Sequence, residues 1–118
     1  MRDFRKLTIW RDGIEIVKQV YDLAKLLPKE EQYGLKAQMC RAAVSIPSNI
    51  AEGCSRNSEI EFKRFLELSM GSAFELETQI QILQELCLVP AEKVEKVAGL
   101  LTSEQKMTNA LISKISKS

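Results

Sequence analysis

The chain has 118 residues and contains no histidine. Histidine is the most frequent general base and metal ligand in proteins, and it is the central member of Ser-His-Asp and Cys-His arrangements. Di-iron sites in helical bundles also depend on Glu-x-x-His pairs. We therefore expect no enzymatic activity, no metal site and no cofactor, and a function in assembly or binding.

Glycine and proline are also scarce, with five and three residues, which disfavours a turn-rich β fold. No apolar run approaches the roughly 18–20 residues that span a bilayer, and no secretory signal follows Met1. The composition, 45% hydrophobic and 28% charged, is ordinary for a globular protein, and the length suits one domain. We expect a cytoplasmic protein that does not contact membranes.

The three cysteines, Cys40, Cys54 and Cys87, are odd in number and widely spaced. This is neither a disulfide framework nor a Cys-x-x-Cys metal pattern. Each cysteine lies among apolar residues at helical spacing, so we expect all three to be small buried side chains.

Apolar residues recur at spacings of three and four in four segments, about 7–27, 33–55, 59–87 and 91–116. Pro28 ends the first segment, and Pro90 suits the first position of the fourth. Ser58-Glu-Ile-Glu61 has the spacing of a capping box at the start of the third. Short connections between amphipathic helices predict a single all-α domain over residues 1–118, an up-down-up-down antiparallel four-helix bundle.

The second predicted helix carries a polar stripe of Ser45, Asn49 and Glu52, together with Pro47. Burying such groups without partners costs roughly 1–3 kcal/mol each, so we expect partners within the chain or in another copy. Local bonds to carbonyls around Pro47 are an equal and compatible alternative for Ser45 and Asn49. Because the apolar phase continues past Pro47, we favour one kinked helix over two pieces.

A buried ion pair is the expected partner arrangement for Arg41. Antiparallel pairing of the second and third helices places Arg41 level with residues 71–75, so Glu75 is the preferred partner and Glu77 the alternative. Together, the residues expected in the polar stripe or an interface are Arg41, Ser45, Asn49, Glu52 and Glu75.

The outer side of the second helix also carries Cys40, Val44, Pro47 and Ala51. One bundle of this size cannot cover every face of that helix, and a leftover apolar strip usually marks an interface. Trp10 belongs either to the core, which we favour, or to this contact. The small residues 71–73 allow another helix to approach closely. We therefore expect self-association.

Charge is polarised along the predicted bundle although the chain is nearly neutral, at +1. Residues 1–13 and 105–118 carry seven basic and two acidic side chains at one end, whereas residues 75–97 carry five glutamates and two lysines at the other. The basic end could attract RNA or DNA, although near-neutrality argues against strong binding, and solvated termini are the simpler reading. The candidate nucleic-acid contacts are Arg2, Arg5, Lys6, Arg11, Lys114 and Lys117. An adaptor that docks a protein partner is the alternative function.

Several motifs resemble a known family: Trp10, Pro28-x-x-Glu31-x-Tyr33-Gly34-Leu35-x-x-Gln38, Arg41-Ala-Ala-x-Ser45-Ile-Pro-Ser-Asn49-Ile-Ala-Glu-Gly53, Gly71-Ser72 and Glu75-Leu76-Glu77-x-Gln79. They are similar to the four-helix-bundle proteins encoded in intervening sequences of 23S ribosomal RNA genes, a family that itself resembles the accessory variability protein of diversity-generating retroelements. The resemblance implies a homo-pentameric ring. The retroelement relatives use a basic surface to bind nucleic acid and a reverse transcriptase, and this chain departs from them in being only weakly basic.

Overall fold

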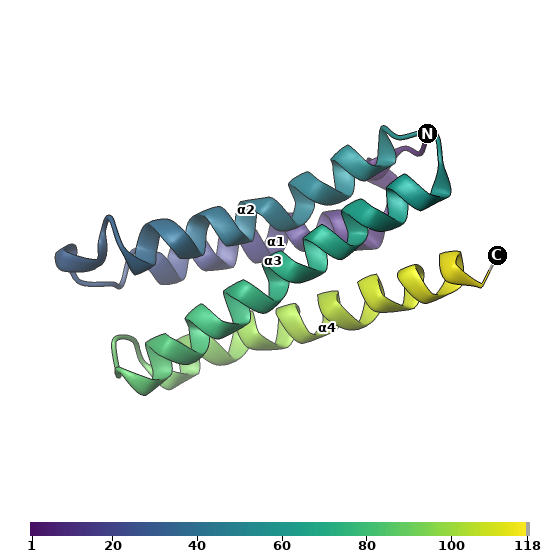
Figure 1. Cartoon of the computed structure of the whole chain (residues 1–118). Coiled ribbons are helices and arrows are strands. Elements are labelled where there is room, and N and C mark those ends of the chain that lie inside the picture. The colour runs from purple at the N-terminus through teal and green to yellow at the C-terminus, as the bar shows by residue number, and fades with distance from the viewer. Residues whose placement is uncertain (118) are drawn as a thin grey trace.

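The computed structural model describes residues 1–117. It contains four α-helices, α1 (Thr8–Ala24), α2 (Leu35–Cys54), α3 (Glu59–Glu85) and α4 (Ala91–Ser116), and two short 3-10 helices, η1 (Phe4–Lys6) and η2 (Lys29–Glu31). Successive α-helices run in opposite directions, so both ends of the chain lie at one end of the bundle (Figure 1). The predicted all-α four-helix bundle is confirmed.

Each helix packs against its neighbours in the chain, and α1 also packs against α4. No Cα atom of α1 lies within 8 Å of one in α3 across residues 1–117, and the same holds for α2 and α4, so these pairs are diagonal. The core is formed by the apolar stripe of each helix, and its fully covered large side chains include Ile16, Val20, Met39, Ile46, Ile50, Phe62, Leu66, Leu76, Leu83, Val94 and Val97.

The helix boundaries follow local signals in the sequence. The backbone N–H of Glu61 donates to the Ser58 side-chain oxygen at 3.1 Å, as the capping box predicts. The largest departure is at the end of the first helix, expected at residue 27 and found at Ala24. Leu27 is nevertheless buried, because the turn after α1 folds it back onto the core, and this keeps the apolar period running past the true helix end.

Helix α2 passes through Pro47 as one continuous helix. The proline ring is buried against α1 at Gly13, where an added Cβ atom would lie 3.2 Å from the Pro47 Cβ atom. Near its end, α2 approaches α3 even more closely, since a Cβ atom at Gly53 would lie 2.7 Å from the Phe65 Cβ atom. The lack of a side chain at Gly13 and at Gly53 therefore allows α2 to pack this closely against α1 and α3.

The cysteines only partly match expectation. Cys54 is buried and Cys40 half-buried, but Cys87 is exposed. Cys87 follows the end of α3 with a φ angle of 52°, and the N–H of Leu88 donates to the Leu83 carbonyl at 3.1 Å. This is a Schellman-type helix end, which turns the residue after the helix out toward solvent. The expectation of a buried Cys87 was wrong because the helical period stops two residues earlier.

Candidate functional site

The polar residues of α2 meet α3 in a small hydrogen-bonded network. The Asn49 side-chain amide donates to the carbonyl of Ser45 at 2.9 Å and to its Oγ at 2.8 Å. Ser72 of α3 donates from its hydroxyl to the Ser45 Oγ at 2.8 Å. One turn away, the buried Ser69 hydroxyl donates to the Ile46 carbonyl at 3.0 Å. The network thus combines the local bonding considered for Ser45 and Asn49 with a bond between helices, and it fixes the register of α2 on α3.

Glu52, the third member of the expected stripe, points outward. Its carboxylate accepts a hydrogen bond from Arg56 at 3.3 Å, and both side chains are substantially exposed. An exposed pair at i,i+4 spacing contributes about 0.3–0.5 kcal/mol at most. The stripe is therefore divided between a half-buried part at the α2–α3 contact and an exposed end.

The expected buried pair of Arg41 and Glu75 is not formed in the single chain. Both side chains are exposed, and Glu75 accepts a hydrogen bond from Gln79 at 3.2 Å instead. The Ser45–Ser72 contact does place Arg41 roughly level with Glu75 along the helices. However, Arg41 comes two residues before the buried Ala43, and two residues turn a helix by about 200°, so its side chain leaves the core.

An apolar strip crosses the outside of the α1–α2 pair. Ile14, Tyr21 and Val44 are exposed large side chains, with Val44 at 40%. By helical phase, Trp10, Val17, Cys40 and Ala51 lie on the same side of these two helices and are half-buried. We call these seven residues the α1/α2 strip. Pro47, expected on the outer side with them, is instead buried against Gly13. Trp10 is shared between core and surface, since it packs against the core cluster and edge-on to Phe4.

The six candidate nucleic-acid contacts lie at the end of the bundle that holds both termini (Figure 1). Arg2 is engaged there, because its guanidinium bonds to Glu59 at 2.7 Å and lies 3.9 Å above the Phe62 ring. This hydrogen bond lowers the pKa of Glu59 below its usual range. The other candidates, Arg5, Lys6, Arg11, Lys114 and Lys117, are exposed.

Apart from Arg2, the basic side chains at this end make only exposed contacts among those described. Arg5 pairs with Asp3 at 3.4 Å, and the Arg11 guanidinium donates to the backbone carbonyl of Arg5 at 3.0 Å. These groups stay accessible to solvent, so their charge is available to a partner.

Sequence reasoning missed one buried acid. Glu104 of α4 is 1% exposed, and neither of its carboxyl oxygens has a hydrogen-bond partner within residues 1–117. Burial, helped by the charge of Asp12, raises the pKa of Glu104 to about 8. The buried Thr108 hydroxyl, one turn further along α4, also has no partner in the described chain. The signal was present in the sequence, since Glu104 falls at helical spacing between the core position Leu101 and Thr108.

Over residues 1–117, no group of three or more cysteine, aspartate or glutamate side chains is placed to hold a metal ion. Across the same range, none of the helices combines the length and apolarity needed to cross a membrane. Burial raises the pKa of both Cys40 and Cys54, which keeps these thiols protonated at neutral pH.

The helices and their packing define an all-α four-helix bundle. The family model of the 23S rRNA-intervening sequence protein matches residues 5–110, and the chain belongs to this family. A crystal structure of a protein of unknown function from the S23 ribosomal protein family of Bacteroides thetaiotaomicron is similar, with a TM-score of 0.83 and 22% identity over 89% of this chain and 98% of that one. Among curated proteins there is no match.

Proposed function

We propose that the protein is a non-enzymatic helical bundle that assembles with copies of itself into a closed ring, of five subunits as the family resemblance implies. The observation that supports this is the α1/α2 strip. By helical phase it places the exposed side chains of Ile14, Tyr21 and Val44 on one side of two packed helices, in addition to four half-buried neighbours. Exposed apolar side chains that occur singly are normal, but a contiguous group of this kind usually marks an interface.

Solution mass tests the assembly. Light scattering coupled to size-exclusion chromatography, over a hundredfold range of protein concentration, should give a mass several times that of the 13.4 kDa chain. Introducing charge into the strip with Tyr21→Glu and Val44→Glu should shift the protein to monomers, because an unpaired charge would have to be buried.

Ile60→Glu is the matched control. Ile60 is 82% exposed, more than either strip residue, and it lies on α3. This variant should keep the mass of the wild type. A wild-type chain that is monomeric at every concentration would rule out self-assembly, and the strip would then favour the adaptor function, in which it contacts a different protein.

A second candidate function is binding of RNA or DNA by the basic end. It is supported by the exposed side chains of Arg5, Lys6, Arg11 and Lys117 at the end of the bundle that holds both termini. In a ring, this end would be repeated once per subunit, so a modest charge per chain would add up to a larger field. Binding of this kind weakens steeply as salt rises, because it depends on release of counterions.

Filter binding at two salt concentrations tests this candidate. Combining Arg5→Ala, Lys6→Ala and Lys117→Ala should abolish retention of a single-stranded RNA at low salt. The control combines Lys29→Ala, Lys36→Ala and Lys93→Ala, which removes the same charge near the opposite end and should leave binding unchanged. Absence of binding by the wild type at low salt, or equal losses in both variants, would exclude a role for the basic end.

A further inference from the structure

The border of the α1/α2 strip and the exposed side of α3 differ in charge. Residues 65–85, which make up most of α3, contain four glutamates and no lysine or arginine. Arg11 and Lys18 of α1 and Lys25, the residue directly after it, are exposed and recur every seven residues, so they form one line along the helix. The acids Glu15 and Asp22 lie, by helical phase, on the side of this line that faces away from the strip. This line runs beside the α1/α2 strip, and the exposed Arg41 of α2 adds a fourth basic group at its edge.

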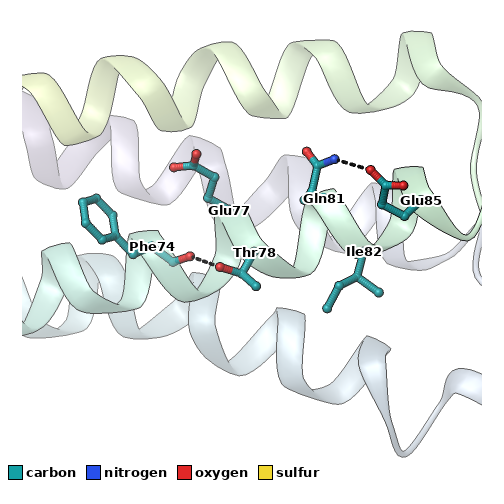
Figure 2. A pocket seen from close by; sticks show the side chains of 6 residues that line it. All are labelled: Phe74, Glu77, Thr78, Gln81, Ile82 and Glu85. Atoms are coloured by element: carbon teal, nitrogen blue, oxygen red, sulfur yellow. Dashed lines mark hydrogen bonds between the residues drawn. The ribbon is translucent and has the colours of Figure 1, made fainter.

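Helix α3 has its own exposed apolar surface inside the acidic stretch. An open groove of about 480 Å³ runs along this helix. Its lining residues are Phe74, Glu77, Thr78, Gln81, Ile82 and Glu85. Figure 2 shows all six side chains projecting from α3. Phe74 is 57% exposed and Ile82 40%, so the groove offers two apolar contacts within an acidic border.

We propose that copies of the protein join head to tail, with the α1/α2 strip and its basic border on one copy packed against the α3 groove of the next. This inference rests on the self-assembly proposed above and adds which surfaces meet. The two surfaces cannot meet within one chain, because α1 and α3 are diagonal and no Cα atoms of the two helices lie within 8 Å of each other over residues 1–117.

Charge disfavours a contact between two identical surfaces. Two α1/α2 strips face to face would bring the lines of Arg11, Lys18 and Lys25 together, and two α3 grooves would oppose glutamates. Juxtaposed like charges cost several kcal/mol, whereas the head-to-tail contact pairs opposite signs. A contact between two different surfaces propagates from copy to copy and gives a ring when the rotation closes.

The basic groups beside the strip can exchange their present partners. Within the chain, Lys18 pairs with Glu15 at 3.5 Å and Lys25 with Asp22 at 3.8 Å. Both pairs are exposed, so replacing them by pairs with another copy costs little.

Apolar burial supplies affinity in this arrangement, and charge selects the partner surface. Tyr21 and Val44 on one copy and Phe74 and Ile82 on the next are the large exposed side chains that would leave water. Exposed ion pairs at the rim add little energy but suppress wrong pairings.

Charge reversal tests the pairing of the two surfaces. The variant Glu77→Lys with Glu85→Lys should raise the dissociation constant of the assembly by roughly a hundredfold, measured by sedimentation, because like charges would face each other. Glu92→Lys with Glu95→Lys makes the same change of net charge on α4 and should have no effect. Circular dichroism checks that both variants are folded. Phe74→Ser, which changes no charge, should also weaken assembly. It replaces Glu77→Lys/Glu85→Lys as the test variant if that protein does not fold.

Mixing makes the test specific. Lys18→Glu with Lys25→Glu should also dissociate, since both surfaces of that variant are acidic. An equimolar mixture with Glu77→Lys/Glu85→Lys should associate again, because the acidic α1/α2 strip of one fits the basic α3 groove of the other. Alternation of the two variants cannot close a ring of five, so rescue is measured as the formation of mixed dimers and open oligomers in sedimentation. A wild type that stays monomeric would overturn self-assembly as a whole. If the wild type assembles but folded reversal variants assemble equally well, or fail to rescue each other, only the head-to-tail pairing is wrong.

Discussion

The carboxyl group of Glu104 lies over Gly13, with its Oε2 atom 3.5 Å from the position that a Cβ atom would take on that glycine. Pro47 occupies the other side of the same position, so α1, α2 and α4 meet at one point of the core. The absence of a side chain on Gly13 leaves room for the acid, but no hydrogen bond to the Glu104 carboxyl oxygens is found within residues 1–117.

Stability should therefore fall as pH rises from about 4.5 to 8. Burial raises the pKa of Glu104 from 4.5 to about 8, so the folded state keeps a proton that the unfolded chain has already released. The stabilising effect of that proton is complete below pH 4.5 and is lost as pH rises through the folded pKa. At about 1.36 kcal/mol per pKa unit, roughly 3 kcal/mol disappears between pH 4.5 and 7. Urea unfolding at fixed protein concentration over this range measures the slope.

Glu104→Gln should remove most of this slope and raise the free energy of unfolding at pH 8. The chain has no histidine, so few other groups titrate in that window. The pKa of Glu59 is lowered by its hydrogen bond to Arg2, and its effect on stability falls at more acidic pH. Glu95→Gln, at an exposed position of the same helix, is the control and should change nothing. An unchanged slope in Glu104→Gln would show that Glu104 is not the responsible group.

Gly53→Ala should destabilise the fold by about 1–3 kcal/mol, the usual cost of overpacking. Its Cβ atom would lie 2.7 Å from the Phe65 Cβ atom and 3.2 Å from a ring carbon of Phe62. Gly99→Ala provides the contrast, because its Cβ atom would meet nothing within 4 Å in the described chain, and alanine favours the helix by about 0.5–1 kcal/mol. Thermal unfolding of both variants should move in opposite directions. Equal losses of stability in the two variants would mean that the close approach of α2 and α3 is not the reason for glycine at position 53.

Arg2→Ala and Arg41→Ala should separate folding from assembly. Arg2 holds the N-terminal segment through Glu59 and the Phe62 ring, so its loss should cost about 1 kcal/mol of unfolding free energy. Arg41 is exposed, and its loss should change monomer stability by less than about 0.5 kcal/mol while weakening assembly. Sequence reasoning predicted the larger effect on fold or assembly for Arg41. A large loss of monomer stability in Arg41→Ala would support the original expectation that Arg41 stabilises the fold.

The sequence predicts the helices well because each signal is local. Apolar residues at spacings of three and four, the Ser58 cap and the proline positions depend only on neighbours along the chain. The same holds for the continuity of α2 through Pro47, where the unbroken apolar phase was a sufficient guide.

Contacts between helices were harder to predict. The position of Arg41 along the helix axis, level with Glu75, was predicted nearly correctly. The direction of its side chain was wrong, because each residue turns the helix by about 100° and small errors in phase move a side chain from the core to the surface. The Ser45–Ser72 bond depends on how α2 and α3 are rotated about their axes as well as on their register, and no local pattern gives that rotation. Glu104 interrupts an apolar stripe, and composition alone does not distinguish a buried neutral acid from a break in the stripe.

Replacing Cys87 by glycine should stabilise the protein. Cys87 adopts a φ angle of 52° at the Schellman end of α3, a conformation that costs an ordinary residue about 1–2 kcal/mol and glycine almost nothing. The greater freedom of glycine in the unfolded chain offsets about 0.5–1 kcal/mol of this gain. We expect a net increase of roughly 0.5–1 kcal/mol, measured by thermal unfolding under reducing conditions. Cys87→Ala removes the same thiol but keeps the strained φ angle, so it should show no gain. If alanine stabilises as much as glycine, the effect comes from loss of the thiol and the backbone conformation is not its cause.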